Sequence, residues 1–402
     1  MLVSAPTQQG RRVVVTGMGV VGPCGIGRDA FWAGLLAPAP EGERRVHDFD
    51  PTAYFGPKEV RRVDRYTQFA VVAADEALAD ANAHGDALPA DPDRAGVWVG
   101  TGVGGLSTLE REIVVNHTKG ARRVSPFLVP MMMNNAAAAT ISMRYGWRGP
   151  CENTVTACAA GTHSVTNGAR LIASGRCDTV LAGSAEAPMT PVGLAAFYNM
   201  TALSRTGFSC PFDKARDGFV ISEGGGILVL EALETAVARG AHIYAEVLGG
   251  ASTADAYHIT APAPSGSGAI GCMELALADA GVTAADVRHV NAHGTSTPLN
   301  DAAEAEAMAK VFGADGPAVT STKGVTGHAL GAAGALEAVA AVLTIEHRLI
   351  PPTAGYRTPD PDLPTMDLVV GDPRPWEPGV TLSNSFGFGG HNGTVVFAPY
   401  TG

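Results

Sequence analysis

The sequence contains two similar runs of helix, loop and strand. The first is EALADANAHGDALPADPDRAGVWVGTG (76–102) and the second is ELALADAGVTAADVRHVNAHGT (274–295). Both hold an ALADA helix end, a short loop with an aspartate, and a strand that runs into glycine and threonine. The ALADA segments begin at Ala77 and Ala276, 199 residues apart. Because self-similarity of this kind indicates a chain built from like units, we predict two similar halves, 1–240 and 241–402, that share one core.

Strands and helices alternate along the chain. The β-branched run RRVVVTGMGVVG (11–22) predicts a buried strand, and the apolar spacing of YTQFAVVAADEALADANAHG (66–85) predicts a helix. Each half also has a small-residue turn that opens a long helix, within 156–174 and within 323–347. The pattern is typical of the α/β class, with a parallel or mixed sheet covered by helices. Two stacked halves would bring their strand and helix ends to one central site.

Composition limits the partners. The 402 residues are 46% hydrophobic and 17% charged, and the net charge of −11 argues against nucleic acid as the main partner. We see no apolar run of the roughly 18–20 residues that a membrane helix needs, and no signal-peptide pattern at the start. We therefore expect a cytoplasmic protein without membrane contact. The most basic segments, VRRVDR (60–65) and KGARRV (119–124), suit either solvated surface or the docking of an acidic carrier protein.

The cysteines show neither a disulfide nor a metal-binding pattern. No CxxC pair occurs and no Cys/His set has ligand spacing, so we expect free thiols and no metal site. Five cysteines are interpreted as small core residues: Cys24, Cys151, Cys177, Cys210 and Cys272.

Cys158 differs from the other five. It follows the strand-like segment NTVTA (153–157), is followed by two alanines and a glycine, and heads a predicted helix. A thiol at a helix N-terminus feels the partial positive charge of unpaired N–H groups, which lowers its pKa. The same N–H groups can hold a developing oxyanion. We therefore predict that Cys158 is a nucleophile.

Two histidines stand where a nucleophile needs partners. His293 lies in VNAHGTSTPLND (290–301), where a strand ends, and His328 lies in the small-residue turn before the second long helix. Strand ends are where α/β folds gather functional groups. His163 and His391 lie near the same segments, and their roles stay open. The other histidines are interpreted as ordinary surface or core residues: His47, His84, His117, His242, His258, His289 and His347.

Five segments together resemble the beta-ketoacyl-acyl carrier protein synthases, the elongating condensing enzymes of the thiolase superfamily. They occur in the family's order across nearly the whole chain: VTACAAG (155–161), PFDKARDGFVISEGGG (211–226), VNAHGTSTPLND (290–301), KGVTGHALGAAGALE (323–337) and NSFGFGGHN (384–392). Histidines at both 293 and 328 match the Cys-His-His group rather than the initiating Cys-His-Asn enzymes. The resemblance implies a thiolase-like fold, in which two βαβαβαββ halves form a five-layered αβαβα core.

The resemblance also implies a role for each matching residue. Cys158 takes the acyl chain from a carrier's phosphopantetheine, and His293 and His328 polarise the malonyl carbonyl and assist decarboxylation. Lys323 and Glu337 set the charge around His328. Two threonines bind the pantetheine arm, and the backbone N–H of a gating aromatic forms the oxyanion hole with that of Cys158; these residues are Thr295, Thr297 and Phe388. No external cofactor is required.

The acyl pocket is less well defined by the sequence. Val103 matches a position that lines the acyl tunnel in relatives, and Phe197 is a further candidate. The run PMMMNN supplies methionines, which fill irregular apolar cavities, so they are candidates for an acyl pocket, a dimer interface or ordinary core packing: Met131, Met132 and Met133. His391 stands where many relatives have threonine, and we interpret it as a mark of a subgroup.

Three functions are compatible with these residues. The first is decarboxylative condensation of a Cys-bound acyl chain with malonyl-acyl carrier protein, in fatty acid or type II polyketide synthesis. The second is a specialised acyltransferase or cyclase that keeps Cys158 and acts on another carrier-bound substrate. The third, a non-catalytic partner subunit, would lack a cysteine or histidine that this chain has. The resemblance further implies an acyl carrier protein as partner, and a homodimer or a heterodimer with a related ketosynthase-like subunit.

Overall fold

The computed structural model describes residues 10–402 and joins both halves through one 12-stranded mixed sheet. The N-terminal half contributes, in spatial order, β1 (Val13–Gly22), β6 (Gly224–Ala232), β5 (Thr179–Glu186), β3 (Ala95–Gly100) and β4 (Cys151–Glu152). The C-terminal half contributes β7 (Ala245–Ala254), β14 (His391–Ala398), β13 (Val380–Gly387), β8 (Val287–Asn291), β9 (Ala318–Thr320) and β11 (Asp367–Leu368). β1 pairs with β7 and thereby connects the halves, while β2 (Gly25–Ile26) pairs with β1. A separate small sheet holds β10 (Leu349–Ile350) and β12 (Arg374–Pro375).

The two halves share one topology, as the repeated sequence pattern predicts. In the first half β1 pairs antiparallel with β6, β6 antiparallel with β5, and β5 and β3 continue in parallel to β4. In the second half β7 pairs antiparallel with β14, β14 antiparallel with β13, and β13 and β8 continue in parallel to β9. The predicted α/β class is therefore confirmed, and the order of strands repeats from one half to the other.

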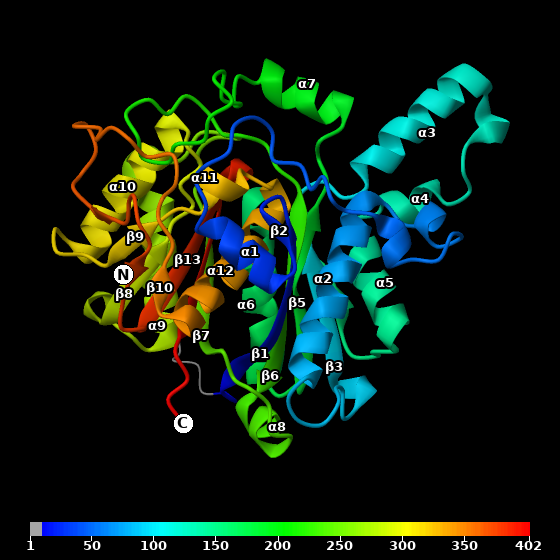
Figure 1. Ribbon diagram of the computed structural model, residues 1–402, viewed down its shortest axis with the longest axis horizontal. Coiled ribbons are helices and arrows are strands. Elements are labelled where there is room, and N and C mark those ends of the chain that lie inside the picture. The colour runs from blue at the N-terminus through cyan, green and yellow to red at the C-terminus, as the bar shows by residue number, and fades with distance from the viewer. Residues whose placement is uncertain (1–9) are drawn as a thin grey trace.

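Helices form the other layers (Figure 1). Two central helices, α6 (Ala160–Ala173) and α12 (Ala333–His347), pack against each other and against strands of both halves. The outer face of the first half carries α2 (Arg65–Asn82) and α5 (Ala136–Tyr145), and that of the second carries α9 (Ser267–Ala280) and α10 (Pro298–Phe312). The strands of each half form one β layer, and over the described part of the chain the two layers are joined only where residues 13–15 of β1 pair with β7. Separate apolar clusters fill the central layer and each outer layer, so the order is αβαβα.

The remaining helices lie around this core. Two of them, α3 (Leu106–Lys119) and α4 (Leu128–Met132), form an arm that projects from the outer side of the first half (Figure 1). The shorter ones are α1 (Arg28–Leu35), α7 (Pro191–Asn199), α8 (Leu233–Ala238) and α11 (Lys323–Thr326). Polar side chains fix several helix starts by accepting backbone N–H bonds: Asp64 for α2, Thr190 for α7 and Thr297 for α10.

Two expectations differ from the structure. We expected the segment 153–157 to be strand-like. The strand ends before it, at β4, which lies at the edge of the sheet; within residues 10–402, β4 pairs with β3 alone and residues 153–156 have no strand pairing. The stretch Leu330–His347 has the length and hydropathy of a membrane span, contrary to our reading of the sequence. Since 89% of it is buried within the protein, it has the surroundings of a core helix.

Candidate active site

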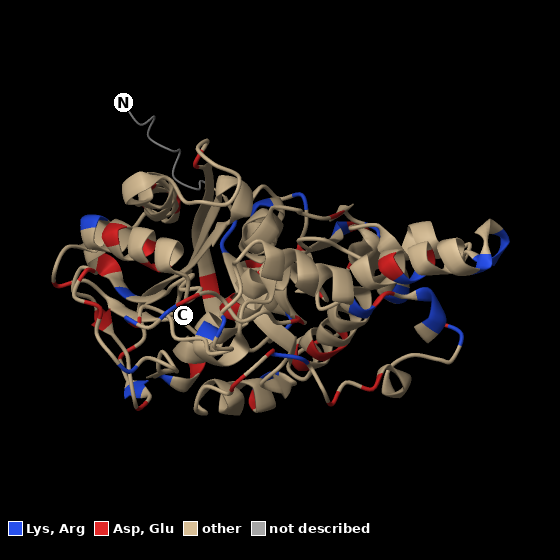
Figure 2. Ribbon diagram, turned by 90° about the horizontal axis from the view of Figure 1, so that it is seen from above, with Lys and Arg blue, Asp and Glu red and all other residues tan. Residues whose placement is uncertain are grey.

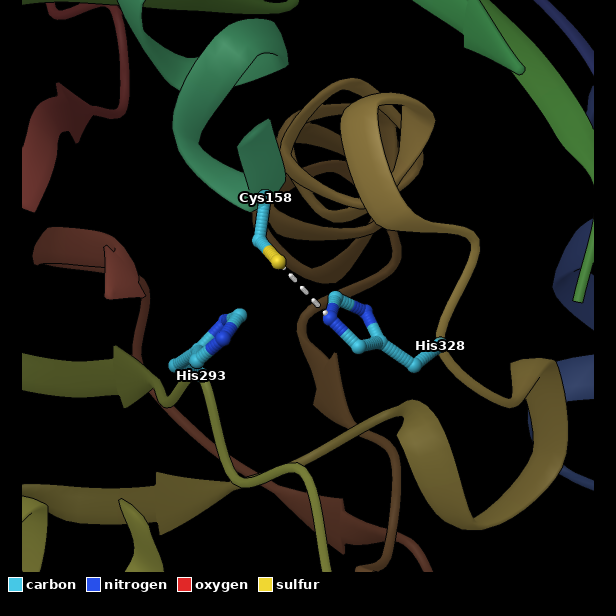
Figure 3. Close-up of side chains that lie close together, drawn as sticks. All are labelled: Cys158, His293 and His328. Atoms are coloured by element: carbon cyan, nitrogen blue, oxygen red, sulfur yellow. Dashed lines mark hydrogen bonds between the residues drawn. The ribbon is translucent and has the colours of Figure 1, made fainter. Parts of the chain in front are cut away.

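The predicted nucleophile and its two histidines come together at equivalent ends of the two halves. Cys158 lies in the short turn that leads into α6, and His328 lies just before the turn that leads into α12. His293 follows the end of β8. The sulfur and ring nitrogens of the three side chains lie within 4.8 Å of one another, and all three residues are buried (Figure 3). The structure therefore assembles the constellation that the sequence predicts.

A tight turn presents the cysteine. Ala157 has a φ of +48°, a left-handed conformation that non-glycine residues rarely adopt and that recurs at functional sites. The turn places Cys158 Sγ 3.0 Å from His328 Nε2 (Figure 3). It also packs against Gly387, where an added Cβ would come within 3.0 Å of the Cys158 backbone nitrogen. A glycine at 387 therefore allows the C-terminal loop to approach the sulfur.

The electrostatics of the thiol correct one prediction. The N–H groups of Phe388 and Cys158 and the charge of Lys323 do lower the pKa of the Cys158 thiol, but burial outweighs them and raises it to about 11. Our expectation of a lowered pKa was wrong, because burial disfavours the charged thiolate more than the N–H groups at the helix N-terminus stabilise it. Burial also lowers the pKa of His328 well below its ordinary value. The resting pair is therefore a neutral thiol facing a neutral imidazole.

Lys323 and Glu337 form a fully buried ion pair beside the histidines. The Lys323 ammonium contacts the Glu337 carboxylate, and its Nζ lies 3.3 Å from His293 Nδ1. Burial raises the pKa of Glu337 to about 7, although Lys323 opposes this shift. We expected the pair to set the charge around His328, and after burial the Lys323 charge does lower the pKa of that histidine. The direct contact of Lys323 is with His293, which follows the end of β8.

The lysine contact fixes the protonation of His293. An ammonium only donates hydrogen bonds, so the Nδ1 that faces it must accept. Burial, and then the nearby Lys323 charge, lower the pKa of His293 well below its ordinary value, so the ring is neutral. Its single proton is therefore on Nε2. His293 is a preset hydrogen-bond donor.

Glu304 is a site residue that the sequence analysis missed. It lies on the inner face of α10, is buried, and accepts hydrogen bonds from the backbone N–H groups of His293 (2.8 Å) and Gly294 (2.7 Å). Burial raises its pKa to about 7. The spacing in the sequence was a signal for it. Glu304 is seven residues, or about two turns, after the N-cap Thr297, so the two residues lie on the same face of the helix.

A cavity of about 380 Å³ leads to the three side chains. Thr295 and Thr297 lie in its wall with their hydroxyl oxygens 2.9 Å apart, and Phe388 also lies in the wall, with its N–H toward Cys158. Gly389 and Gly390, with φ of +80° and +72°, allow the sharp turn that follows Phe388. The predicted pantetheine and gate residues thus lie at the site.

The acyl-pocket candidates do not line this cavity. Val103 and Met133 are exposed, and Met132 is half-buried. Met131 is buried in the wall of a different cavity, between α3 and the segment before α2. Phe197 is connected to the site through one residue, because it packs on Phe219, which contacts the His328 ring edge to face. The location of the acyl chain stays a prediction.

The same three side chains have the donors of a zinc site, with one thiol and two imidazoles within 4.8 Å of one another. Lys323 argues against that use, because its buried positive charge lies 3.3 Å from a ring nitrogen of His293 and repels a second cation. The expectation of a metal-free site stays a prediction.

Comparison with known proteins identifies the family. The family described as "Beta-ketoacyl synthase, N-terminal domain" matches residues 37–236, and "Beta-ketoacyl synthase, C-terminal domain" matches residues 244–357. The chain is 44% identical to a 3-oxoacyl-[acyl-carrier-protein] synthase 2 of Synechocystis sp., over 97% of this chain and 98% of that protein.

Solved structures agree. The ishigamide ketosynthase/chain length factor matches with a TM-score of 0.89 and 34% identity over 98% of this chain and 100% of that one. The ketosynthase complex AntDE:AntF, a type II PKS acyl-carrier protein in complex with its ketosynthase bound to the hexaketide, matches with a TM-score of 0.87 and 35% identity, over 98% of this chain and 100% of that one. With the fold, the site and these relatives in agreement, the chain belongs to the beta-ketoacyl synthase family.

Proposed function

We propose that the chain catalyses the decarboxylative Claisen condensation of a Cys158-bound acyl group with malonyl-acyl carrier protein, giving a beta-ketoacyl-acyl carrier protein. The observation that carries the proposal is the contact of Cys158 Sγ with His328 Nε2, 3.0 Å, beside a second histidine at the end of a threonine-lined cavity. The names of the relatives favour this reaction over the specialised acyltransferase or cyclase. The proposal requires no cofactor beyond the carrier's phosphopantetheine. The expected cytoplasmic location stays a prediction.

Acyl loading is the first step. His328 Nε2 takes the thiol proton, and Cys158 Sγ attacks the acyl thioester carbonyl. The N–H groups of Cys158 and Phe388, which already face the sulfur, are suited to hold the oxyanion. When the tetrahedral intermediate collapses, the carbon–sulfur bond to pantetheine breaks, and the departing sulfur receives the proton from His328. Loading thus consumes no net proton.

Condensation follows on the acylated enzyme. The malonyl carboxylate leaves as carbon dioxide, and the electron pair of the broken carbon–carbon bond forms an enolate. The preset Nε2–H of His293 is suited to donate to the enolate oxygen, with His328 as the second group beside it. The enolate carbon then attacks the acyl carbonyl on Cys158. A new carbon–carbon bond forms, the Cys158 thiolate leaves, and it takes up one proton to restore the thiol.

The reaction can be tested in two stages. The protein is exposed to a panel of acyl-carriers and Cys158 acylation is followed by intact mass; malonyl-carrier is then added, and carbon dioxide and beta-ketoacyl product are measured. We expect acylation followed by equal amounts of both products. Acylation without carbon dioxide release would favour the acyltransferase or cyclase instead.

The projecting arm is the proposed contact for the carrier. Figure 2 shows Lys and Arg gathered at its tip, although the chain as a whole is acidic. The tip carries Lys119, Arg122 and Arg123, and Arg61 and Arg62 are exposed on the neighbouring segment. A local basic surface attracts an acidic carrier protein by charge complementarity. The AntDE:AntF complex, which contains an acyl-carrier protein, supports a partner of this kind.

Charge reversal on the arm is expected to weaken carrier binding without changing the chemistry. In Arg122→Glu/Arg123→Glu we expect KM for acyl-carrier to rise about 10-fold at low salt, because rim charges mainly affect association. The rate with a small acyl thioester that has no carrier should stay unchanged. Steady-state kinetics at two salt concentrations measure this.

Arg176→Glu is the matched control, because Arg176 is exposed beyond the end of α6 that is remote from Cys158. The arm proposal is wrong if both variants raise KM equally.

The edge strand β4 is the proposed contact for a second subunit. Its outer side has no partner strand among the described residues, and an exposed edge offers free N–H and C=O groups for pairing. Met143 and Val155 are exposed apolar residues close to β4 in the sequence. The ishigamide ketosynthase/chain length factor supports a related subunit as partner, and a homodimer stays the alternative. Light scattering that gives a monomer mass would contradict both.

A further inference from the structure

A buried carboxylate that the mechanism does not use lies beside the catalytic residues. Glu186 ends β5 and has no exposed surface. Each of its two oxygens accepts two hydrogen bonds. Oε1 accepts from the Thr101 hydroxyl (3.0 Å) and the Val103 N–H (3.2 Å), and Oε2 accepts from the Gly102 N–H (2.5 Å) and the Gly331 N–H (3.1 Å).

These bonds connect two loops from different halves of the chain. Residues 101–104 follow β3, whereas Gly331 lies in the turn between His328 and α12. The two backbones touch at the carboxylate, since a Cβ added to Gly331 would lie 2.1 Å from the Gly102 nitrogen and 2.6 Å from Glu186 Oε2. Only glycine fits there. Glu186 is therefore the common acceptor at a contact between the halves.

The turn that Glu186 holds is strained and reaches the site. Leu330 has a φ of +46°, which a branched side chain rarely adopts, so surrounding contacts must hold it. Leu330 lines the active-site cavity and packs in one apolar cluster with Phe219. Phe219 in turn contacts the His328 ring, with centroids 5.2 Å apart. A shift of this turn would move His328 relative to Cys158.

We propose that Glu186 is a positioning residue, which in its ionised form fastens the loop that carries Val103 to the turn after His328 and so holds His328 against Cys158. The inference rests on the proposed function and adds a residue that touches no substrate. A carboxylate is suited to this role because its two oxygens only accept. A glutamine would place an NH₂ group against N–H donors, and two of the four bonds would be lost.

The arrangement makes the site sensitive to pH. No lysine or arginine forms an ion pair with Glu186 among residues 10–402, and burial raises its pKa to about 7. As pH falls through about 7, one oxygen becomes a hydroxyl donor that faces donors, so the fastening weakens and kcat falls. Activity is therefore expected to be lost on the acid side of about pH 7.

Other titrating groups near the carboxylate are distinguishable. Cys158 and Tyr66 interact with Glu186, but burial raises the pKa of both well above neutrality. The pKa values of Glu304 and Glu337 are also raised to about 7, so an acid-side loss alone does not identify Glu186. The part of the loss that is due to Glu186 must disappear in a variant that cannot titrate at position 186, so the inflection becomes smaller.

The test compares kcat, KM and pH dependence in three variants. In Glu186→Gln we expect kcat for condensation to fall about 10- to 100-fold, because small misplacements of catalytic groups cost that much, with KM for acyl-carrier unchanged. Its acid-side inflection near pH 7 should be smaller than that of the wild type. Gly331→Ala disturbs the same contact and leaves the carboxylate in place, so kcat should fall while the inflection remains.

Glu231→Gln is the matched control for loss of a buried carboxylate. Glu231 lies on β6, has no exposed surface and bonds to Arg239 and Thr16, and none of these three residues lines the active-site cavity. Its substitution should lower Tm and leave kcat unchanged. The inference is overturned if Glu186→Gln keeps the wild-type kcat and pH profile, or if Glu231→Gln lowers kcat as much. Absence of condensation by the wild type would instead overturn the proposed function, because only the comparison of variants tests Glu186.

Discussion

Replacement of Cys158 by alanine is expected to abolish the acyl-enzyme and to lower condensation by about 10⁴-fold or more, since loss of a nucleophile removes most of the chemical rate enhancement. The structure gives the reason, because Cys158 is the cysteine that faces both His328 Nε2 and two N–H groups. Intact mass after exposure to acyl-carrier measures the acyl-enzyme, and product analysis after malonyl-carrier measures condensation.

Two other cysteines control for adventitious acylation. Cys151 is exposed in the single chain, at the sheet edge that we propose as the subunit contact, and it lies away from the histidines. Cys210 is buried and contacts Ser296. Cys151→Ala and Cys210→Ala should load acyl groups as the wild type does. Full condensation by Cys158→Ala would overturn the proposed mechanism.

Sequence symmetry predicted most of the fold. The two ALADA segments lie at equivalent positions, near the C-terminal ends of α2 and α9, and each is followed by the corresponding strand of its half, β3 or β8. The duplicated topology also explains the site, because the turn into α6 carries Cys158 and the equivalent region before α12 carries His328. A repeated pattern thus predicted both the layers and the place where function gathers.

Contacts between residues distant in the sequence could not be predicted in the same way. Whether Lys323 touches His293 or His328 depends on the direction of α11, which no local pattern encodes. The pKa of Cys158 depends on how deeply the second half covers it, and the net effect is opposite to that of its helix position alone. The reacting groups could be identified from the sequence, but the burial that shifts their pKa values could not.

Buried carboxylates are the clearest case. Glu186 and Glu304 are not marked as site residues by any motif in the sequence, yet both are buried and accept backbone N–H bonds beside the site. Their partners include residues distant in the sequence, such as Gly331 for Glu186. Only the packed structure shows which N–H groups need an acceptor, because buried polar groups are almost always paired.

Replacement of His293 by alanine is expected to lower malonyl decarboxylation by about 10²- to 10³-fold, the usual effect of losing one oxyanion donor. Acyl loading should change little, because the contact at 3.0 Å with the Cys158 sulfur is made by His328. His293 is instead held by Lys323 with its Nε2–H available to the enolate. Intact mass reports loading, and carbon dioxide release reports decarboxylation on the same sample.

His328→Ala provides the contrast that makes this assignment specific. His328 Nε2 faces the sulfur and shares the pocket with His293, so its loss should slow loading as well as decarboxylation. The two variants each remove one imidazole ring, and the two rings are neighbours in space. If the substitutions only damaged the buried site in general, both variants would lose loading and decarboxylation alike. Equal losses of loading and carbon dioxide release in His293→Ala would show that the division of roles is wrong. Retained loading with lost release would assign the enolate donor to His293, the histidine whose proton Lys323 directs toward the substrate.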